Sequence, residues 1–161
     1  MNYWEIPEFY ERRKKIDESI NNIKRLIKEG KMPIKEINKE IKRVIKEIEE
    51  LRDFMLENSK YYDRNGAELI KPEVVYILGI IIYWFMNIKE DEQVPVSALQ
   101  EFIRKECGYN FSLETVGRLL KMALDDWDLL SKKNMLEDVK ELLEIGDIKE
   151  AIRLLSIYNE V

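Results

Sequence analysis

VVYILGIIIYWFM, residues 74–86, is the longest apolar run of the chain and decides the predicted fold. Its length rises roughly 20 Å as a helix, short of the ~30 Å hydrocarbon core of a bilayer, and Glu73 and Lys89 flank it. Pro72 fits the first helical position, and a helix that is apolar on every side has to be surrounded by other elements. We therefore expect a buried helix at the centre of an all-α core, with Gly79 permitting a close helix crossing. A buried β-strand is the alternative, because Val, Ile, Tyr and Trp favour strands.

Two amphipathic helices are predicted before this run. Ile16, Ile20, Ile23 and Ile27 form the apolar stripe of the first helix. A heptad seam forms that of the second: Ile34, Ile37, Ile41, Val44, Ile48, Leu51 and Met55. Gly30 and Pro33 between them predict a short connection, so residues 1–65 are expected to form an antiparallel coiled-coil hairpin. Its seam either packs internally or serves as an interface for a second copy or a partner protein.

Residues 97–121, SALQEFIRKECGYNFSLETVGRLLK, predict two short helices joined by a turn. Ser97 and Gln100 have the spacing of a capping box, and Gly108 is a left-handed helix stop. With Ser112 as N-cap, the second helix buries its leucines and valine and turns polar side chains outward. The segment is therefore expected to form a compact pair of helices.

This pattern resembles the helix-turn-helix and winged-helix DNA-binding domains. The resemblance implies a recognition helix that presents Ser112, Thr115, Arg118 and Lys121 to duplex DNA. The connection at residues 107–111 is longer than the simplest such turn, and residues 125–133 show no hairpin pattern that would form a wing. An ordinary corner between two helices is the alternative.

The composition bounds the chemistry. The chain has no His and one Cys, which removes the commonest metal ligand and general base, so no catalytic residue, metal or cofactor is expected. Cys107 cannot form an intramolecular disulfide, and the N-terminus lacks the pattern of a secretory signal, so a cytoplasmic protein without a membrane segment is expected. The charged fraction of 37% resembles hyperthermophile residue usage.

The charge balance limits nucleic-acid binding. The net charge is -5, and only residues 1–65 are slightly basic, with 16 Lys and Arg against 14 Asp and Glu. Arg12 and Arg13 begin the sharpest basic cluster and are candidate phosphate contacts. Acidic residues flank them, so a solvated helix face with ion pairs is the alternative.

The C-terminal part, residues 66–161, is expected to form a compact helical domain. Asn134 and Asp147 predict helix starts, and Gly146 predicts a helix end, which gives a helical hairpin over residues 134–161. Asp125, Asp126 and Asp128 are interpreted as a turn between helices, with magnesium binding as the alternative.

Two functions follow from these patterns. The first is a small DNA-binding or DNA-associated protein with a regulatory role, which self-associates through its helical arm. The second is a non-catalytic helical subunit or scaffold of a larger assembly with no direct DNA contact.

Overall fold

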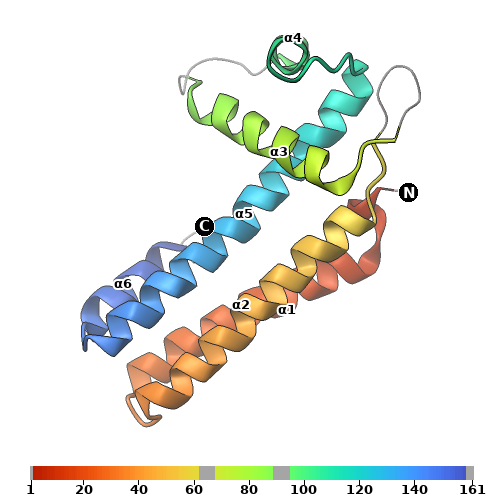
Figure 1. The fold of residues 1–161 in the computed structure, drawn as a ribbon. Helices are drawn as coiled ribbons and strands as arrows, with labels where there is room; N and C mark the ends of the chain where they lie inside the picture. Colours follow the sequence, from red (N-terminus) through yellow and green to blue (C-terminus); the bar gives the residue numbers. More distant parts are fainter. Residues whose placement is uncertain (1, 62–67, 89–94, 159–161) are drawn as a thin grey trace. The chain divides into compact units, whose positions relative to one another are not determined.

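The computed structural model describes residues 2–61, 68–88 and 95–158, and these ranges form helices and no strand (Figure 1). The protein is therefore all-α, as predicted. The elements are η1 (Tyr3–Glu5), α1 (Pro7–Glu29), α2 (Ile34–Glu57), α3 (Lys71–Met86), α4 (Val96–Cys107), α5 (Leu113–Glu144) and α6 (Ile148–Tyr158).

The chain divides into two compact units, and α5 contributes to both. One unit comprises Met1–Met55 and Leu129–Val161, and the other comprises Leu56–Asp128. The division predicted from the sequence was at residues 65 and 66, with the C-terminal hairpin in the second domain. That predicted division into residues 1–65 and 66–161 stays a prediction.

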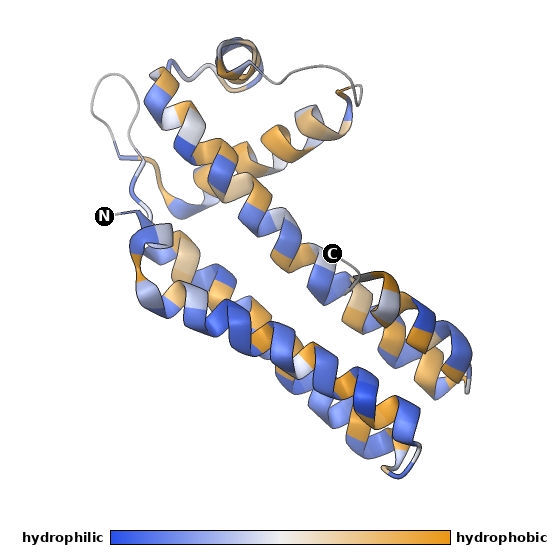
Figure 2. Cartoon of the chain, turned by 180° about the vertical axis from the view of Figure 1, so that it is seen from behind, coloured by the Kyte–Doolittle hydropathy of each residue, from blue (hydrophilic) through white to orange (hydrophobic). Residues whose placement is uncertain are grey.

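The first unit has a core of aliphatic side chains from four helical segments. Gly30 ends α1 in the left-handed conformation, at φ 64°, and its N–H donates to the carbonyl of Leu26. Figures 1 and 2 show α1 and α2 side by side, and α6 contacts α1. The predicted stripe of α1 is buried, and so is the seam of α2 except Ile34. The coiled-coil geometry of this pair stays a prediction.

Two lysines of α5 connect it to α1 and α2 within this unit. Lys132 Nζ lies 2.8 Å from Asp17 Oδ1 of α1, and Lys133 Nζ lies 3.1 Å from Glu49 Oε1 of α2. Four buried apolar residues of this half of α5 complete the core: Leu129, Leu136, Val139 and Leu143. The second half of α5 therefore packs with the N-terminal helices, through contacts between residues far apart in the sequence.

The second unit is built from α3, α4 and the first half of α5. Its core takes residues from each helix: Val74, Ile77, Leu78 and Ile81 of α3, Leu99 and Ile103 of α4, and Val116, Leu119, Met122 and Ala123 of α5. Gln100 Nε2 donates to the carbonyl of Phe111 at 2.6 Å, and the Tyr109 hydroxyl donates to Glu73. These bonds fix the connection between α4 and α5 against α3 and α4.

Helix α3 confirms a helix over residues 74–86, with Pro72 in its first turn, and excludes the strand. The expectation that every side of this helix is buried was wrong. Val75, Tyr76, Tyr83 and Met86 are exposed. The expected close crossing at Gly79 is also wrong within the described chain, because a Cβ built there would meet no atom within 4 Å.

Helix α5 corrects the predicted C-terminal layout. It runs unbroken from Leu113 to Glu144, so Asn134 is inside a helix and the aspartate cluster is not a turn. Asp125 and Asp126 are buried side chains of this helix. Neither Gly nor Pro occurs between Gly117 and Gly146. The residues on both sides of Asn134 therefore continue the helix, and its capping side chain does not start a new one.

The helix starts match the sequence prediction in part. Thr115 N–H donates to Ser112 Oγ at 3.2 Å, and Glu150 N–H donates to Asp147 Oδ1 at 3.2 Å, so both predicted N-caps are confirmed. Ser97 is not a cap, because α4 already begins at Val96. Its expected capping-box partner, Gln100, bonds the Phe111 carbonyl instead.

Candidate interaction surfaces

The predicted DNA-contact residues lie at the start of α5. Ser112 caps the helix, and its hydroxyl donates to Thr115 Oγ1 at 3.0 Å. Arg118 forms an ion pair with Glu114 at 2.5 Å, and Lys121 Nζ lies 3.7 Å from Asp125 Oδ2. Ser112, Thr115, Arg118 and Lys121 therefore belong to the first three turns of one helix. Their role in DNA binding stays a prediction.

The charges on this part of α5 balance. Glu114, Arg118, Lys121 and Asp125 follow one stripe at i, i+4, i+7 and i+11, with two positive and two negative side chains. Binding to DNA draws most of its free energy from cations that neutralise phosphates. This stripe offers duplex DNA no net positive charge.

Tyr61 lies close to the same stripe. Burial raises the pKa of Tyr61 to about 12, while the positive charge of Arg118 acts in the opposite direction and Asp125 raises it further. The phenol is therefore kept neutral in a buried place. Arg118 therefore interacts electrostatically with Tyr61 and forms an ion pair with Glu114.

The second predicted DNA-contact cluster is on α1. Arg12 pairs with Glu8 at 2.8 Å, and its guanidinium lies 4.9 Å from the centre of the Phe54 ring. Arg13 lies 6.0 Å from the centre of the Phe9 ring. Both arginines are therefore engaged with side chains of their own unit, and their role in phosphate binding stays a prediction.

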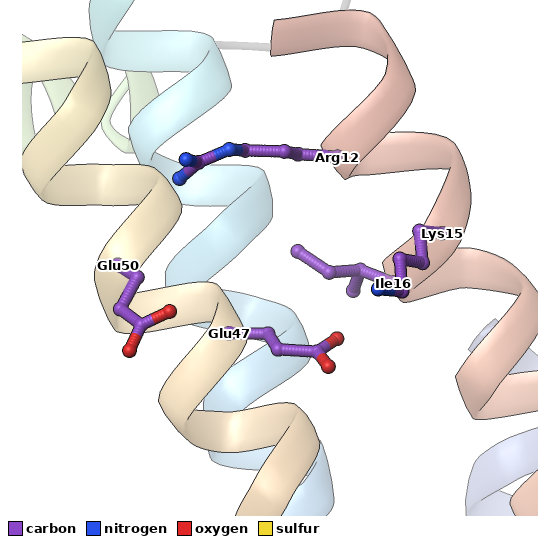
Figure 3. Close-up of a pocket in the computed structure, with 5 residues that line it drawn as sticks. All are labelled: Arg12, Lys15, Ile16, Glu47 and Glu50. Carbon is purple, nitrogen blue, oxygen red and sulfur yellow. The ribbon is translucent and has the colours of Figure 1, made fainter. Parts of the chain in front are cut away.

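A shallow pocket of about 280 Å³ lies between α1 and α2, next to Arg12. In Figure 3, Arg12 extends from α1 toward α2, and Glu47 extends from α2 toward α1. Two cations, Arg12 and Lys15, and two carboxylates, Glu47 and Glu50, line it together with Ile16. The pocket is therefore balanced in charge.

A row of lysines on α2 was missed by the sequence analysis. Lys35, Lys39, Lys42 and Lys46 recur at i, i+4, i+7 and i+11, which places them on one stripe, and all four are exposed. Lys39 pairs with Glu36 at 3.3 Å, whereas the other three have no ion-pair partner among the described residues. The spacing of the lysines carries this signal, whereas a charge balance taken over a whole segment conceals it.

The α2 lysine row borders a pocket of about 390 Å³ that Lys140 of α5 also lines. Asn38 lines it too; this side chain is 9% exposed, and its Oδ1 has no hydrogen-bond partner among the described residues. Lys140 Nζ lies 3.8 Å from Glu144 Oε1. This part of the first unit has a clear excess of positive charge.

The outer face of α3 is the second surface that the sequence analysis missed. Val75 is 41% exposed, Tyr76 59%, Tyr83 66% and Met86 67%. These four residues, together with the exposed Gly79 among them, are called the α3 outer face below. Figure 2 shows α3 as hydrophobic along most of its length. An apolar face is therefore left uncovered by the described chain.

An apolar pocket adjoins this face where α3 approaches α5. Met86 lines it, and Leu124 and Trp127 of α5 line it at 39% and 43% exposure. The remaining lining residues are also apolar: Ile81, Ile82, Phe85, Leu120 and Ala123. The α3 outer face therefore continues onto α5 without an intervening charge.

Two observations concern metal binding and the single cysteine. Within them, no group of three or more His, Cys, Asp or Glu residues could hold a metal ion. Burial, and to a lesser extent Glu106, raises the pKa of the Cys107 thiol above its usual value, which disfavours the reactive thiolate. No helix of the described chain combines the length and apolar character needed to cross a membrane.

Comparison with known proteins adds no assignment. No protein-family model matches the chain, and neither the curated proteins nor the solved structures contain a match to it. The function therefore has to be argued from the surfaces of the chain itself.

Proposed function

We propose that the protein is a non-catalytic helical subunit that binds a protein partner through the α3 outer face and the adjoining Leu124 and Trp127. The observation that carries this proposal is the exposure of Tyr76, Tyr83 and Met86 on a helix whose opposite side is anchored in the core. Tyr, Trp and Met are enriched in protein interfaces, where they supply large contact areas.

The size of the surface supports the same function. A large side chain has a surface of about 200 Å². On this basis, the exposed area of the four side chains of the α3 outer face, together with that of Leu124 and Trp127, is roughly 600 Å². The largest apolar patch on a typical monomer is about 300–600 Å² and is often functional. An uncovered patch at the top of this range favours a binding surface.

The test is size-exclusion chromatography of extracts from cells that make the protein. The wild-type chain is expected to elute in a species larger than the monomer, and the double variant Tyr83→Lys, Met86→Lys is expected to elute as the monomer. Tyr10→Lys is the matched control, because Tyr10 is 52% exposed but lies on α1 in the other unit. Elution of the α3 variant with the wild-type species would contradict the proposal.

Association with duplex DNA is the second candidate function, and the lysine row of α2 favours it. Three of the four lysines have no ion-pair partner among the described residues, unlike Arg118 and Lys121 at the start of α5. The phosphate contacts are therefore proposed to come chiefly from α2 and Lys140 of the first unit. Base reading by Ser112, Thr115, Arg118 and Lys121 of the second unit stays a separate proposal.

A DNA titration at several salt concentrations tests this candidate. The double variant Lys35→Gln, Lys42→Gln is expected to make the negative slope of log K against log salt shallower by about 2, since each lost phosphate contact removes about 0.9. Arg118→Ala should leave that slope nearly unchanged. Absence of binding by the wild-type chain at low salt would remove DNA association from consideration.

Two further proposals carry over from the sequence. Self-association through the α2 seam would have to involve Ile34 or the charged rim, because the other six seam residues are already buried in the chain. A cytoplasmic location and a regulatory role remain predictions without a structural test.

A further inference from the structure

We propose that the partner of the α3 outer face is a second copy of this chain, with two α3 helices crossing at Gly79. This inference rests on the proposed binding role of that face and identifies its occupant. It assigns the self-association of the protein to α3 instead of to the heptad seam of α2.

The position of Gly79 is the first argument. With about 100° of rotation per residue, the α3 outer face covers an arc of about 100°, and Gly79 lies near its middle. Tyr76 precedes it by about one turn and Tyr83 follows it by about one turn. A side chain at this position would point away from the chain into open space.

The environment of Gly79 makes a second helix its natural neighbour. Glycine weakens a helix interior relative to alanine, and no intramolecular contact in the described chain requires it here. Small residues at a helix contact let two backbones approach closely. At a two-fold crossing centred on Gly79, Tyr76 and Tyr83 of each copy flank the point of closest approach.

The absence of charge is the second argument for a copy of the same chain. From Val74 to Ile88, the sequence contains no Asp, Glu, Lys or Arg. A two-fold interface brings the same patch of both copies together, and an uncharged patch meets itself without like-charge repulsion. A partner selected by charge complementarity would find nothing to recognise on this face.

The area is the third argument. Burial of the α3 outer face together with Leu124 and Trp127, roughly 600 Å² on each copy, gives roughly 1,200 Å² in total, the lower end of the range for specific protein interfaces. Interfaces of this size form reversible complexes, so the expected dissociation constant is on the order of micromolar. The dimer should therefore dissociate on dilution.

The test is sedimentation equilibrium of the purified full chain over a concentration series that brackets the micromolar range. Wild type is expected to pass from monomer to dimer. Gly79→Ala places a methyl group of each copy at the crossing point, and overpacking there should weaken the dimer about tenfold or more. Tyr83→Lys should also weaken it, because it places two like charges beside the crossing.

Gly117→Ala is the matched control. Gly117 is inside α5, and a Cβ there would also meet no atom within 4 Å. In dilute solution, where the chain is a monomer, both glycine variants should raise Tm by about 2–4 °C. Only Gly79→Ala should then weaken the dimer, which separates an effect on the interface from an effect on the helix.

A wild-type chain that stays monomeric throughout the series would overturn the inference, and so would dimers that Gly79→Ala and Tyr83→Lys leave intact. Neither result decides the proposed function. That is decided by the extract experiment: if the purified chain stays monomeric, loss of a larger species from the α3 variant in extracts shows a different protein on the same face. Failure of both experiments would remove the α3 outer face as a binding surface.

Discussion

The ion pair between Lys132 and Asp17 predicts an asymmetric response to removal of its two partners. Lys132 Nζ lies 2.8 Å from Asp17 Oδ1, and the side chains are 4% and 48% exposed, respectively. Asp17→Asn removes the carboxylate that pairs with a buried positive charge. Lys132→Met removes that charge and keeps a side chain of similar length.

The magnitude follows from the burial. Loss of one partner of a fully buried ion pair destabilises a protein by about 3–5 kcal/mol. Asp17 is half exposed, so water can solvate part of the site, and we expect about 1.5–3 kcal/mol for Asp17→Asn. Lys132→Met should change the free energy of unfolding by less than about 1.5 kcal/mol, because it also removes the cost of burying the ammonium.

Urea unfolding followed by circular dichroism measures both changes. Glu8→Gln is the control, because the Glu8–Arg12 pair is exposed and its removal should cost less than about 1 kcal/mol. If Asp17→Asn is no more destabilising than Glu8→Gln, the reasoning is refuted. In that case Lys132 is not buried against α1, and the second half of α5 does not belong to the N-terminal unit.

Three further predictions concern the helix ends and a buried phenol. Ser112→Ala removes the cap of α5 and should destabilise the protein by about 1 kcal/mol, whereas Ser97→Ala, inside α4, should change little in the same urea assay. Asn134→Ala should stabilise the protein by a few tenths of a kcal/mol in thermal unfolding, because alanine continues an exposed helix better than asparagine. The pKa of Tyr61 is raised from 10.0 to about 12, so the unfolded chain loses this proton first, and the free energy of unfolding should fall by about 2 kcal/mol between pH 10 and 12. Tyr61→Phe should lack this part of the loss when both proteins are unfolded in urea across that pH range.

Each of these predictions has a distinct contrary result. Equal losses for Ser112→Ala and Ser97→Ala would mean that the cap does not stabilise α5. A loss of about 1 kcal/mol for Asn134→Ala would place a helix start at that residue and break α5. Identical pH dependence of Tyr61→Phe and the wild type would mean that the phenol is not buried.

The helices could be predicted from the sequence because their signals are local. The apolar stripe of α1 and the seam of α2 follow the helical period, and Gly30, Gly108 and Ser112 mark ends that the structure confirms. The wrong prediction of a helix start at Asn134 also comes from a local signal. A capping residue shows where a helix can begin, and the residues around Asn134 favour its continuation.

The exposed side of α3 could not be predicted, because the run from Val74 to Met86 has no polar side that marks solvent. Periodicity identifies a buried face only where polar residues define the opposite one. The packing of Lys132 against Asp17 was equally hidden, since it joins residues far apart in the chain. By contrast, the Glu114–Arg118 pair and the lysine row of α2 can be predicted from helical spacing, because residues at i and i+4 lie on the same face of a helix.

The central claim is that the α3 outer face is open in the folded monomer, and methionine oxidation tests it most directly. Met86 is 67% exposed, whereas Met55 and Met122 are fully buried, so the chain carries its own internal controls. In dilute, folded protein treated with peroxide and analysed by peptide mass spectrometry, Met86 is predicted to oxidise well before Met55 and Met122. Oxidation of Met86 as slow as that of the two buried methionines would contradict the claim.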